Sequence, residues 1–210
     1  MPLYRKIQID HKTTVLIWKI SESFNELFRK VKLKDVSLAR LEGMKSESHQ
    51  NGFLAVRMLL QEVNYTDFDL YYDEFGKPHL LDGVHISISH SFEFSVIILS
   101  NKNIGIDLEL RRDKIIKIAT KFASEPFVYN DQFNKLDFIS KLTVVWGVKE
   151  AVFKIRNEVG ISFIDHIFVD KFEMSNNKIT ALLNFNNLKI MFEGSFVEVE
   201  NYTIVWLWEI

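Results

Sequence analysis

The sequence predicts an α+β fold made of two halves of similar make-up. In residues 1–102 a strand is followed by helices and then by antiparallel strands, and a strand, helices and strands occur again in residues 103–210. A chain of 210 residues with 47% hydrophobic content can bury a substantial core. No Pro/Gly-rich linker separates the halves, so we expect them to pack as one body.

The first half is predicted to begin with a strand and two helices. Residues 13–20 are rich in β-branched and aromatic side chains, which favours a strand. Ser23 and Glu26 have the spacing of a capping box, so a helix should follow as far as about residue 31. Apolar residues recur every three or four positions over 46–63, which predicts an amphipathic helix with Arg57 beside its apolar stripe.

Strands are predicted for the middle and the end of the chain. Short β-type runs at 68–72, 84–89, 94–100 and 104–110 are separated by turn residues, and we expect the last two to form a hairpin. In the second half, helical spacing occurs at 115–122 and at 142–156. Four further strand-like runs then complete the chain, and the last of them covers 202–208.

The composition excludes several classes of function. With 26 basic and 28 acidic residues the formal net charge is −2, so no global field favours nucleic acid or an anionic membrane. The absence of cysteine excludes disulfides, Cys-ligated metal sites and thiol nucleophiles. No run approaches the roughly 18 apolar residues of a membrane span, and no signal-peptide pattern is visible, so we expect a soluble, cytoplasmic protein.

Two carboxylates in the Ile-Gly-Ile-Asp-Leu-Glu segment 104–109 suit a divalent cation. In a strand, Asp107 and Glu109 lie on the same face because side chains alternate with a period of two. Mg²⁺ takes one or two carboxylates, keeps several waters and is usually completed by substrate phosphates. For an isolated pair of this kind, a solvated edge face is the favoured interpretation.

A second polar cluster is predicted on the helix over 146–154. Steps of four residues align Trp146, Glu150 and Lys154, while Lys149 and Phe153 form the adjoining row. One carboxylate and two cations would then lie along one side of the helix. Taken alone, the spacing is explained better by an ordinary Glu-to-Lys pair on an exposed helix.

Two further segments could contact phosphate. Pro78 restricts its own backbone and that of Lys77, which would present the lysine stiffly, although a plain turn explains the Gly-Lys-Pro segment 76–78 as well. The Ser-Ile-Ser-His-Ser segment 87–91 offers hydroxyl and imidazole donors. A Ser-His hydrolase is disfavoured here because neighbours in an extended chain point to opposite faces.

Taken together and in this order, segments 76–78, 87–91, 104–109 and 146–154 resemble the 4'-phosphopantetheinyl transferase superfamily, in its larger, surfactin-synthetase-activating type. The hallmark is a G-I/V-D strand followed at a set distance by W-x-x-K-E-A/S-x-x-K. The flanks agree, because 53–57 resembles the family's A-x-R helix and 160–163 its segment after the catalytic helix. The resemblance implies a pseudodimer of two related α+β halves with the active site and coenzyme A in the cleft between them.

The resemblance implies roles for particular residues in the second half. Asp107, Glu109 and Glu150 would hold Mg²⁺ together with the pyrophosphate of coenzyme A. Glu150 would also act as general base, with Asp107 and Lys154 completing the catalytic group and Lys154 steadying the leaving phosphate. Lys149 would join Lys154 in binding coenzyme A.

In the first half, the resemblance implies further contacts with coenzyme A. Arg57 and His90 would contact the 3'-phosphate end, and Ser89 would bond a phosphate oxygen. Lys77 and Pro78 would line the pocket for the adenine and phosphate groups.

The implied reaction transfers the 4'-phosphopantetheine group of coenzyme A to a serine of an apo acyl or peptidyl carrier protein and releases 3',5'-ADP. The carrier would belong to fatty-acid, polyketide or nonribosomal peptide synthesis, and the enzyme is expected to be a monomer with neither nucleic acid nor membrane as a partner. The alternatives are a coenzyme A or nucleotide-binding module that has lost transfer and, less favoured, a structural protein with an aromatic interaction surface.

The sequence departs from the family pattern in two places. Gly147 stands where the family usually has Ser, Thr or Cys, and His49 with Gly52 replaces the more usual Arg and Glu before the A-x-R helix. A glycine inside a helix costs up to about 1 kcal/mol relative to alanine, so the first change predicts altered rigidity or substrate contact. The second predicts weaker binding of coenzyme A.

Overall fold

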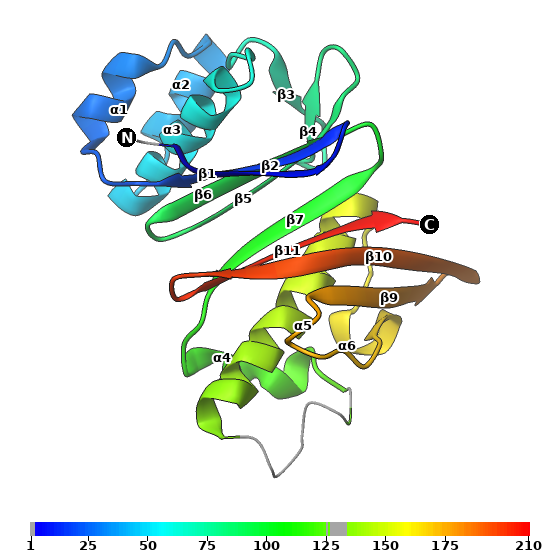
Figure 1. Cartoon of the computed structure of the whole chain (residues 1–210). Coiled ribbons are helices and arrows are strands. Elements are labelled where there is room, and N and C mark those ends of the chain that lie inside the picture. Colours follow the sequence, from blue (N-terminus) through cyan, green and yellow to red (C-terminus); the bar gives the residue numbers. More distant parts are fainter. Residues whose placement is uncertain (1–2, 125, 127–133) are drawn as a thin grey trace. The chain divides into compact units, whose positions relative to one another are not determined.

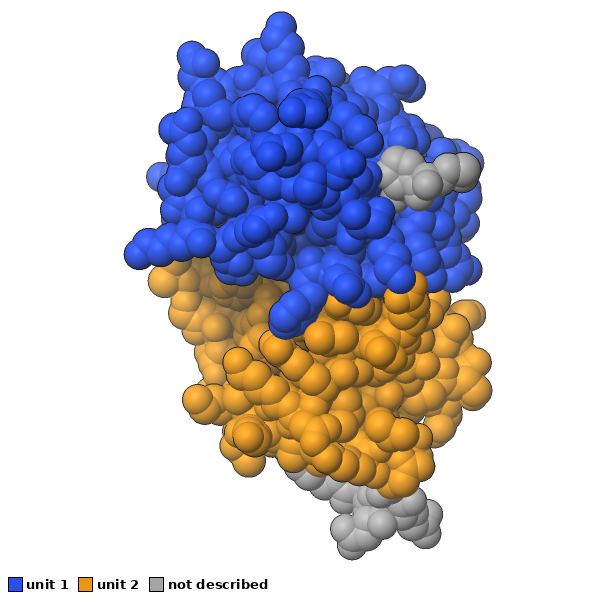
Figure 2. Space-filling model, turned by 90° about the vertical axis from the view of Figure 1, so that its left-hand side faces the viewer, with its two compact units in different colours: residues 1–101 blue, residues 102–210 orange. Residues whose placement is uncertain are grey.

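The computed structural model describes residues 3–124, 126 and 134–210, and the chain forms two compact units, residues 1–101 and 102–210. Figure 1 gives the order of the elements, and Figure 2 colours the two units separately. Each unit contains an antiparallel sheet with one long helix packed on it. The predicted α+β class is therefore confirmed. Among the described residues, no helix combines the length and the apolar character needed to cross a bilayer.

Unit 1 is a four-stranded sheet in the order β1-β2-β6-β5, with a separate two-stranded sheet of β3 and β4. Helix α3 packs on β2, β5 and β6, and its apolar stripe forms the core of the unit with the facing strand residues. The elements of this unit are β1 Leu3–Asp10, β2 Thr13–Lys19, α1 Phe24–Lys30, α2 Asp35–Glu42, α3 Glu47–Gln61, β3 Leu70–Tyr72, β4 Pro78–Leu80, β5 His85–Ser91 and β6 Phe94–Ser100.

The capping box predicted for the first helix is present. The backbone N–H of Ser23 donates to Oε2 of Glu26 at 2.8 Å, and α1 begins at the next residue. Strand β1 and helix α2 were not predicted, since β1 is largely exposed along its length and α2 buries only Ser37 and Leu41. Weakly patterned elements of this kind are defined by tertiary packing more than by local sequence.

A buried ion pair ties α2 and α3 to the loop that follows α3. The Nε of Arg57 donates to Oδ1 of Asp67 at 2.9 Å, and both side chains are almost fully buried. Asp67 also accepts from the hydroxyl of Ser37 at 3.0 Å and from the backbone N–H of Lys34 at 3.0 Å. The guanidinium of Arg57 lies 3.4 Å from the ring centroid of Phe53.

Removing one partner of this pair is expected to destabilise unit 1 strongly. Asp67→Ala leaves a buried guanidinium without its counter-charge, which costs about 3 to 5 kcal/mol. The control is Glu198→Ala, which breaks the more exposed pair between Glu198 and Arg111 in unit 2 and should cost at most about 1 kcal/mol. Urea unfolding measures both. Equal losses of stability would show that burial does not govern the strength of these pairs.

Unit 2 is a five-stranded antiparallel sheet in the order β7-β11-β10-β9-β8. Helix α5 packs on β7, β11 and β8. The elements are β7 Ile104–Leu110, α4 Lys114–Ile118, a 3₁₀ turn Ala119–Lys121, α5 Lys135–Arg156, α6 Phe163–His166, β8 Ile167–Val169, β9 Lys178–Phe185, β10 Leu188–Val199 and β11 Tyr202–Glu209. The four strands predicted for the end of the chain are present.

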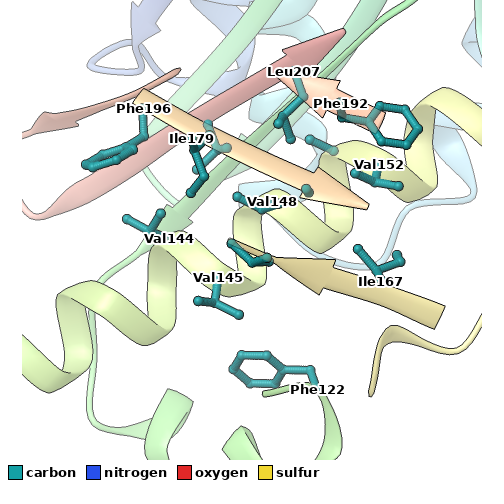
Figure 3. Close-up of a cluster of buried hydrophobic side chains, with 14 of the residues drawn as sticks. Phe122, Val144, Val145, Val148, Val152, Ile167, Ile179, Phe192, Phe196 and Leu207 are labelled. Atoms are coloured by element: carbon teal, nitrogen blue, oxygen red, sulfur yellow. The ribbon is translucent and has the colours of Figure 1, made fainter. Parts of the chain in front are cut away.

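Helix α5 is defined by its caps and by the core that it covers. The side chain of Asn134 accepts from the backbone N–H groups of Leu136 and Asp137, and Asn157 ends the helix in the left-handed conformation with φ 50°. Its buried face is rich in valine, which is only a moderate helix former, so packing stabilises the helix more than propensity does. Figure 3 shows these valines among the strand side chains and Phe122.

The hairpin predicted for residues 94–100 and 104–110 is wrong. Strand β6 pairs with β2 and β5 in unit 1, whereas β7 pairs with β11 in unit 2. The hairpin instead joins β5 to β6 through Phe92, whose φ is 48°, and Glu93. Residues 101–103 have turn-forming composition, but here they connect strands of different sheets, and turn composition alone does not distinguish these two uses.

Candidate active site

The two carboxylates of β7 face helix α5. Asp107, which is only 4% exposed, accepts a hydrogen bond at 2.7 Å from Nζ of Lys154, and that ammonium also donates to the carbonyl of Ile106 at 3.0 Å. Glu109, two residues further along the strand, accepts from the indole N–H of Trp146 at 3.2 Å. The period of two therefore places both side chains against residues of one helix.

Glu150 lies between Trp146 and Lys154 on α5, one turn from each. Burial raises its pKa to about 7, and the Asp107 carboxylate adds to the shift while Lys154 opposes it. Burial likewise raises the pKa of Glu109 to about 7, again with a contribution from Asp107. The carboxylates therefore form one electrostatically coupled group in which Lys154 offsets only part of the negative charge.

Close packing of β7 on α5 creates this arrangement. A Cβ added to Gly105 would lie 2.1 Å from the carbonyl oxygen of Ala151, so only glycine allows the strand to approach the helix so closely. Ala151 is adjacent to Glu150 and precedes Lys154 by three residues. The approach at Gly105 thus sets the distance between the acidic strand and the polar row of α5.

Gly147 has a similar role beside Asp107. A Cβ at this position would lie 2.7 Å from Cγ2 of Val205 and 3.7 Å from Oδ2 of Asp107. The glycine therefore allows the middle of α5 to lie against β11, where Val205 pairs with Asp107 in the sheet. Gly147 departs from the Ser, Thr or Cys that the family usually has at this position, and Val205 lies where a side chain at position 147 would be.

The raised pKa values predict a pH-dependent difference in stability. A carboxyl whose pKa is about 7 when folded and 4.5 as a free side chain stabilises the fold fully below about pH 4.5, and this contribution is lost as the pH rises through about 7. Glu150→Gln removes the titration. Without divalent cations, the variant should gain stability relative to the parent, on the order of 2 kcal/mol, between about pH 5 and pH 8.

Thermal unfolding of both proteins at several pH values measures this difference. The control is Glu193→Gln, because Glu193 is half-buried like Glu150 but lies outside the coupled carboxylates and accepts a hydrogen bond from the indole of Trp208 on the sheet of unit 2. Its unfolding profile should run parallel to that of the parent. A parallel profile for Glu150→Gln would instead contradict the raised pKa of Glu150.

The carboxylates of Asp107, Glu109 and Glu150, called the acidic group below, have the chemistry to bind a divalent cation. Among the residues that the structure describes, no three His, Asp or Glu side chains converge closely enough to enclose a metal ion by themselves. Mg²⁺ does not require this, because it is commonly held by one or two carboxylates together with water and substrate phosphates. Since Lys154, with a smaller contribution from Arg112 at Glu109, offsets only part of the charge of the coupled carboxylates, the residues present fit a hard cation with oxygen ligands.

Lys149 lies inside unit 2. Its side chain is 0% exposed, and its Nζ donates to the carbonyl oxygen of Phe163 at 3.0 Å. The side chain is therefore buried away from solvent, and the hydrogen bond to Phe163 is a structural contact. Its predicted contact with coenzyme A stays a prediction that this geometry does not favour.

In unit 1, Lys77 and Pro78 lie at the turn between the two short strands. Gly76 adopts φ 82°, the backbone N–H of Lys77 donates to Oδ1 of Asp73 at 2.9 Å, and Pro78 begins β4 opposite Tyr72. The turn is thereby fixed by an aspartate as well as by the proline. Lys77 is half-buried.

Ser89 and His90 lie on opposite faces of β5, as alternation requires. Ser89 is 8% exposed, whereas His90 is exposed and its ring lies edge-on to that of His49, with 5.9 Å between the centroids. A Cβ at Gly52 would lie 2.6 Å from Cδ2 of His90. Gly52 therefore makes room for His90, and this packing accounts for His49 and Gly52, which lie inside α3 and not before it as expected.

The contacts of Arg57 differ most from the expectation. At 2% exposed, its guanidinium binds Asp67 and also donates to the carbonyl of Phe53 at 3.2 Å. The arginine was expected beside the apolar stripe of α3, facing a ligand, but the structure gives it a partner within unit 1. The acidic partner lies ten residues along the chain, in a loop whose position sequence periodicity does not predict.

Sequence reasoning gave Trp146 no role in the site. Its indole N–H contacts Glu109, which is 37 residues away in the chain. The available signal was the alignment of Trp146 with Glu150 and Lys154 in one helical row, which places an N–H donor at the end of the acidic cluster.

Comparisons with known proteins agree with these motifs. No protein-family model matches the chain. Over 124 residues it is 30% identical to the 4'-phosphopantetheinyl transferase gsp of Aneurinibacillus migulanus, which covers 57% of this chain and 52% of that protein. It is 26% identical over 121 residues to the 4'-phosphopantetheinyl transferase Sfp of Bacillus subtilis strain 168, covering 52% and 53% of the two chains.

A further 4'-phosphopantetheinyl transferase of Bacillus subtilis is 36% identical over 88 residues, 39% of this chain and 38% of that protein. The chain thus matches at most about half the length of these curated relatives. Its α+β organisation, with one antiparallel sheet in each unit, is consistent with the two-halved fold of Sfp-type transferases. The chain is therefore a homologue of the 4'-phosphopantetheinyl transferases, as its motifs predicted.

Proposed function

We propose that this protein transfers the 4'-phosphopantetheine group of coenzyme A to a serine of an apo acyl or peptidyl carrier protein. The observation that carries the proposal is the contact of β7 with α5, which brings Asp107 to Lys154 at 2.7 Å and Glu109 to Trp146 at 3.2 Å, with Glu150 between the two helix residues. Homology to transferases of this kind supports the same reaction.

The reaction forms a bond between the serine oxygen and the β-phosphorus of coenzyme A and breaks the bond from that phosphorus to 3',5'-ADP. Glu150 takes the proton of the attacking hydroxyl, and its pKa of about 7 suits a general base near neutral pH. Lys154 balances the negative charge that develops on the departing phosphate oxygen. Positioning and electrostatics therefore supply most of the catalysis.

Asp107, Glu109 and Glu150 are the residues that would hold Mg²⁺. When bound, the ion would neutralise charge on the pyrophosphate of coenzyme A. In its absence, Lys154 remains paired with Asp107, so the same lysine is available to a phosphate only after this pair loosens. Mg²⁺ and Lys154 would therefore compete for the Asp107 carboxylate, so the contacts of Lys154 would depend on whether the cation is bound.

The residues proposed to contact coenzyme A in unit 1 are Lys77, Pro78, Ser89 and His90. Their support is chemical, because an ammonium, a hydroxyl and an imidazole are donors that suit phosphate oxygens. His49 packs against His90 and would lie beside the same phosphate. Arg57 would act indirectly, by fixing α3 against the loop that contains Asp67.

The test is transfer to a panel of apo carrier proteins in the presence of coenzyme A and Mg²⁺, followed by mass spectrometry. The proposal expects at least one carrier to gain one 4'-phosphopantetheine group on its serine and to gain nothing when Mg²⁺ is chelated. If no carrier is modified, calorimetry with coenzyme A shows whether the protein still binds this co-substrate. Binding of coenzyme A without transfer to any carrier would identify a binding module, and absence of both would refute the proposal.

A further inference from the structure

One side chain outside the acidic group holds one of its members in place. The Nε1 of Trp146 on α5 donates to Oε1 of Glu109 on β7 at 3.2 Å. Glu109 has three rotatable side-chain bonds, so without this contact its carboxylate could adopt several orientations. The hydrogen bond engages one oxygen and leaves the other for a further partner.

The indole that makes this contact is itself fixed by aromatic neighbours. The ring of Phe122 lies 5.0 Å from that of Trp146 at an interplanar angle of 75°, and the ring of Phe163 lies 5.5 Å away at 59°. Both pairs have the tilted or edge-to-face geometry that aromatic rings favour. Phe163 also contacts Phe153 of α5, with 5.9 Å between the centroids.

A hydrogen bond from Lys149 fixes the aromatic cluster of Phe122, Trp146 and Phe163 against α5. Its fully buried ammonium donates to the carbonyl of Phe163 at 3.0 Å, which anchors the start of α6 against α5. Burying an ammonium is unfavourable unless hydrogen bonds compensate for it, so a lysine here indicates a position where the carbonyl contact matters. The contacts run in sequence from Lys149 through Phe163 and Trp146 to Glu109.

We propose that Trp146 is the positioning residue for Glu109 as a ligand of a divalent cation, and that Lys149 acts through Trp146 by fixing Phe163. This inference rests on the proposed function, because it assumes that Glu109 binds the cation. Groups that orient metal ligands by hydrogen bonding change metal affinity by about 10- to 100-fold when they are removed. Trp146 touches neither cation nor substrate and acts only through the carboxylate.

The experiment measures Mn²⁺ binding to the full chain by the electron paramagnetic resonance signal of the free ion. Trp146→Phe keeps a ring in the aromatic cluster and removes the N–H, and it is expected to weaken Mn²⁺ binding about 10-fold. The matched control is Trp208→Phe, which deletes the equivalent hydrogen bond from Trp208 to Glu193 at 3.0 Å and should leave Mn²⁺ affinity unchanged.

A double-mutant cycle separates positioning from general damage to the fold. In a Glu109→Gln background, Trp146→Phe should have no further effect on Mn²⁺ affinity, because the group through which it acts is already changed. Lys149→Met should weaken binding in the parent but not in Trp146→Phe. Thermal unfolding of each variant checks that the comparison is made between folded proteins.

The inference would be overturned if Trp146→Phe bound Mn²⁺ as tightly as the parent does. In that case, transfer activity of the parent would show that the proposed function nevertheless stands. Additive losses of Mn²⁺ affinity in Trp146→Phe and Glu109→Gln would also overturn the inference, since Trp146 would then act independently of Glu109. A parent protein that binds no Mn²⁺ and transfers nothing would refute the proposed function, and the inference with it.

Discussion

Asp107→Asn and Glu150→Gln are each expected to reduce transfer to a carrier protein by at least about 100-fold. Each substitution preserves shape and removes a negative charge from the coupled acidic group. The loss follows because Asp107 both holds Lys154 and offers a cation ligand, while Glu150 is the proposed base, and such groups each contribute about 10²- to 10⁴-fold.

Initial rates measured by mass spectrometry at saturating Mg²⁺ and coenzyme A test this expectation. Glu198→Gln is the control, because Glu198 pairs with Arg111 at 2.8 Å on a partly exposed surface and should retain the parental rate. Full activity in both Asp107→Asn and Glu150→Gln would refute the assignment of these residues. Loss in the control as well would indicate a general sensitivity of unit 2 to removal of charge.

Gly105→Ala is expected to destabilise unit 2 by about 3 kcal/mol, at the upper end of the usual cost of overpacking. The added Cβ would meet backbone atoms of Ala151, the carbonyl oxygen at 2.1 Å and its carbon at 2.9 Å, and a helix backbone cannot move aside as a flexible side chain can. Either β7 separates from α5 or the unit unfolds. In both cases the distance between Asp107 and Lys154 increases and transfer falls with stability.

The control for this substitution is Gly43→Ala. Gly43 has φ −71°, and its added Cβ would meet only ordinary contacts at 3.5 and 3.6 Å, so alanine should be neutral or slightly stabilising. Urea unfolding compares the two variants. A loss below about 1 kcal/mol for Gly105→Ala would show that the packing of β7 on α5 is looser than this structure has it.

Local periodicity was enough to predict the arrangement within each polar segment. The two-residue repeat predicted a common face for Asp107 and Glu109, and the four-residue repeat predicted the row of Trp146, Glu150 and Lys154. Both patterns are intrinsic to a strand and a helix. They also predicted the α+β class, since the order of the elements depends on the same two periods.

Contacts between distant segments could not be predicted in this way. The pairing of β7 with β11 places residues about 100 positions apart opposite each other, for example Asp107 and Val205, and no local pattern specifies it. The same limit applies to the burial of Arg57 against Asp67 and to the hydrogen bond from Trp146 to Glu109. In each case the partner is determined by packing of the whole unit.

The most direct test of the account is a crystal of the protein soaked with Mn²⁺ and coenzyme A, with the metal located by its anomalous scattering. We expect one peak with carboxylate oxygens of Asp107, Glu109 and Glu150 as ligands, completed by water and phosphate oxygens. A peak bound elsewhere, or bound by none of these three side chains, would contradict it.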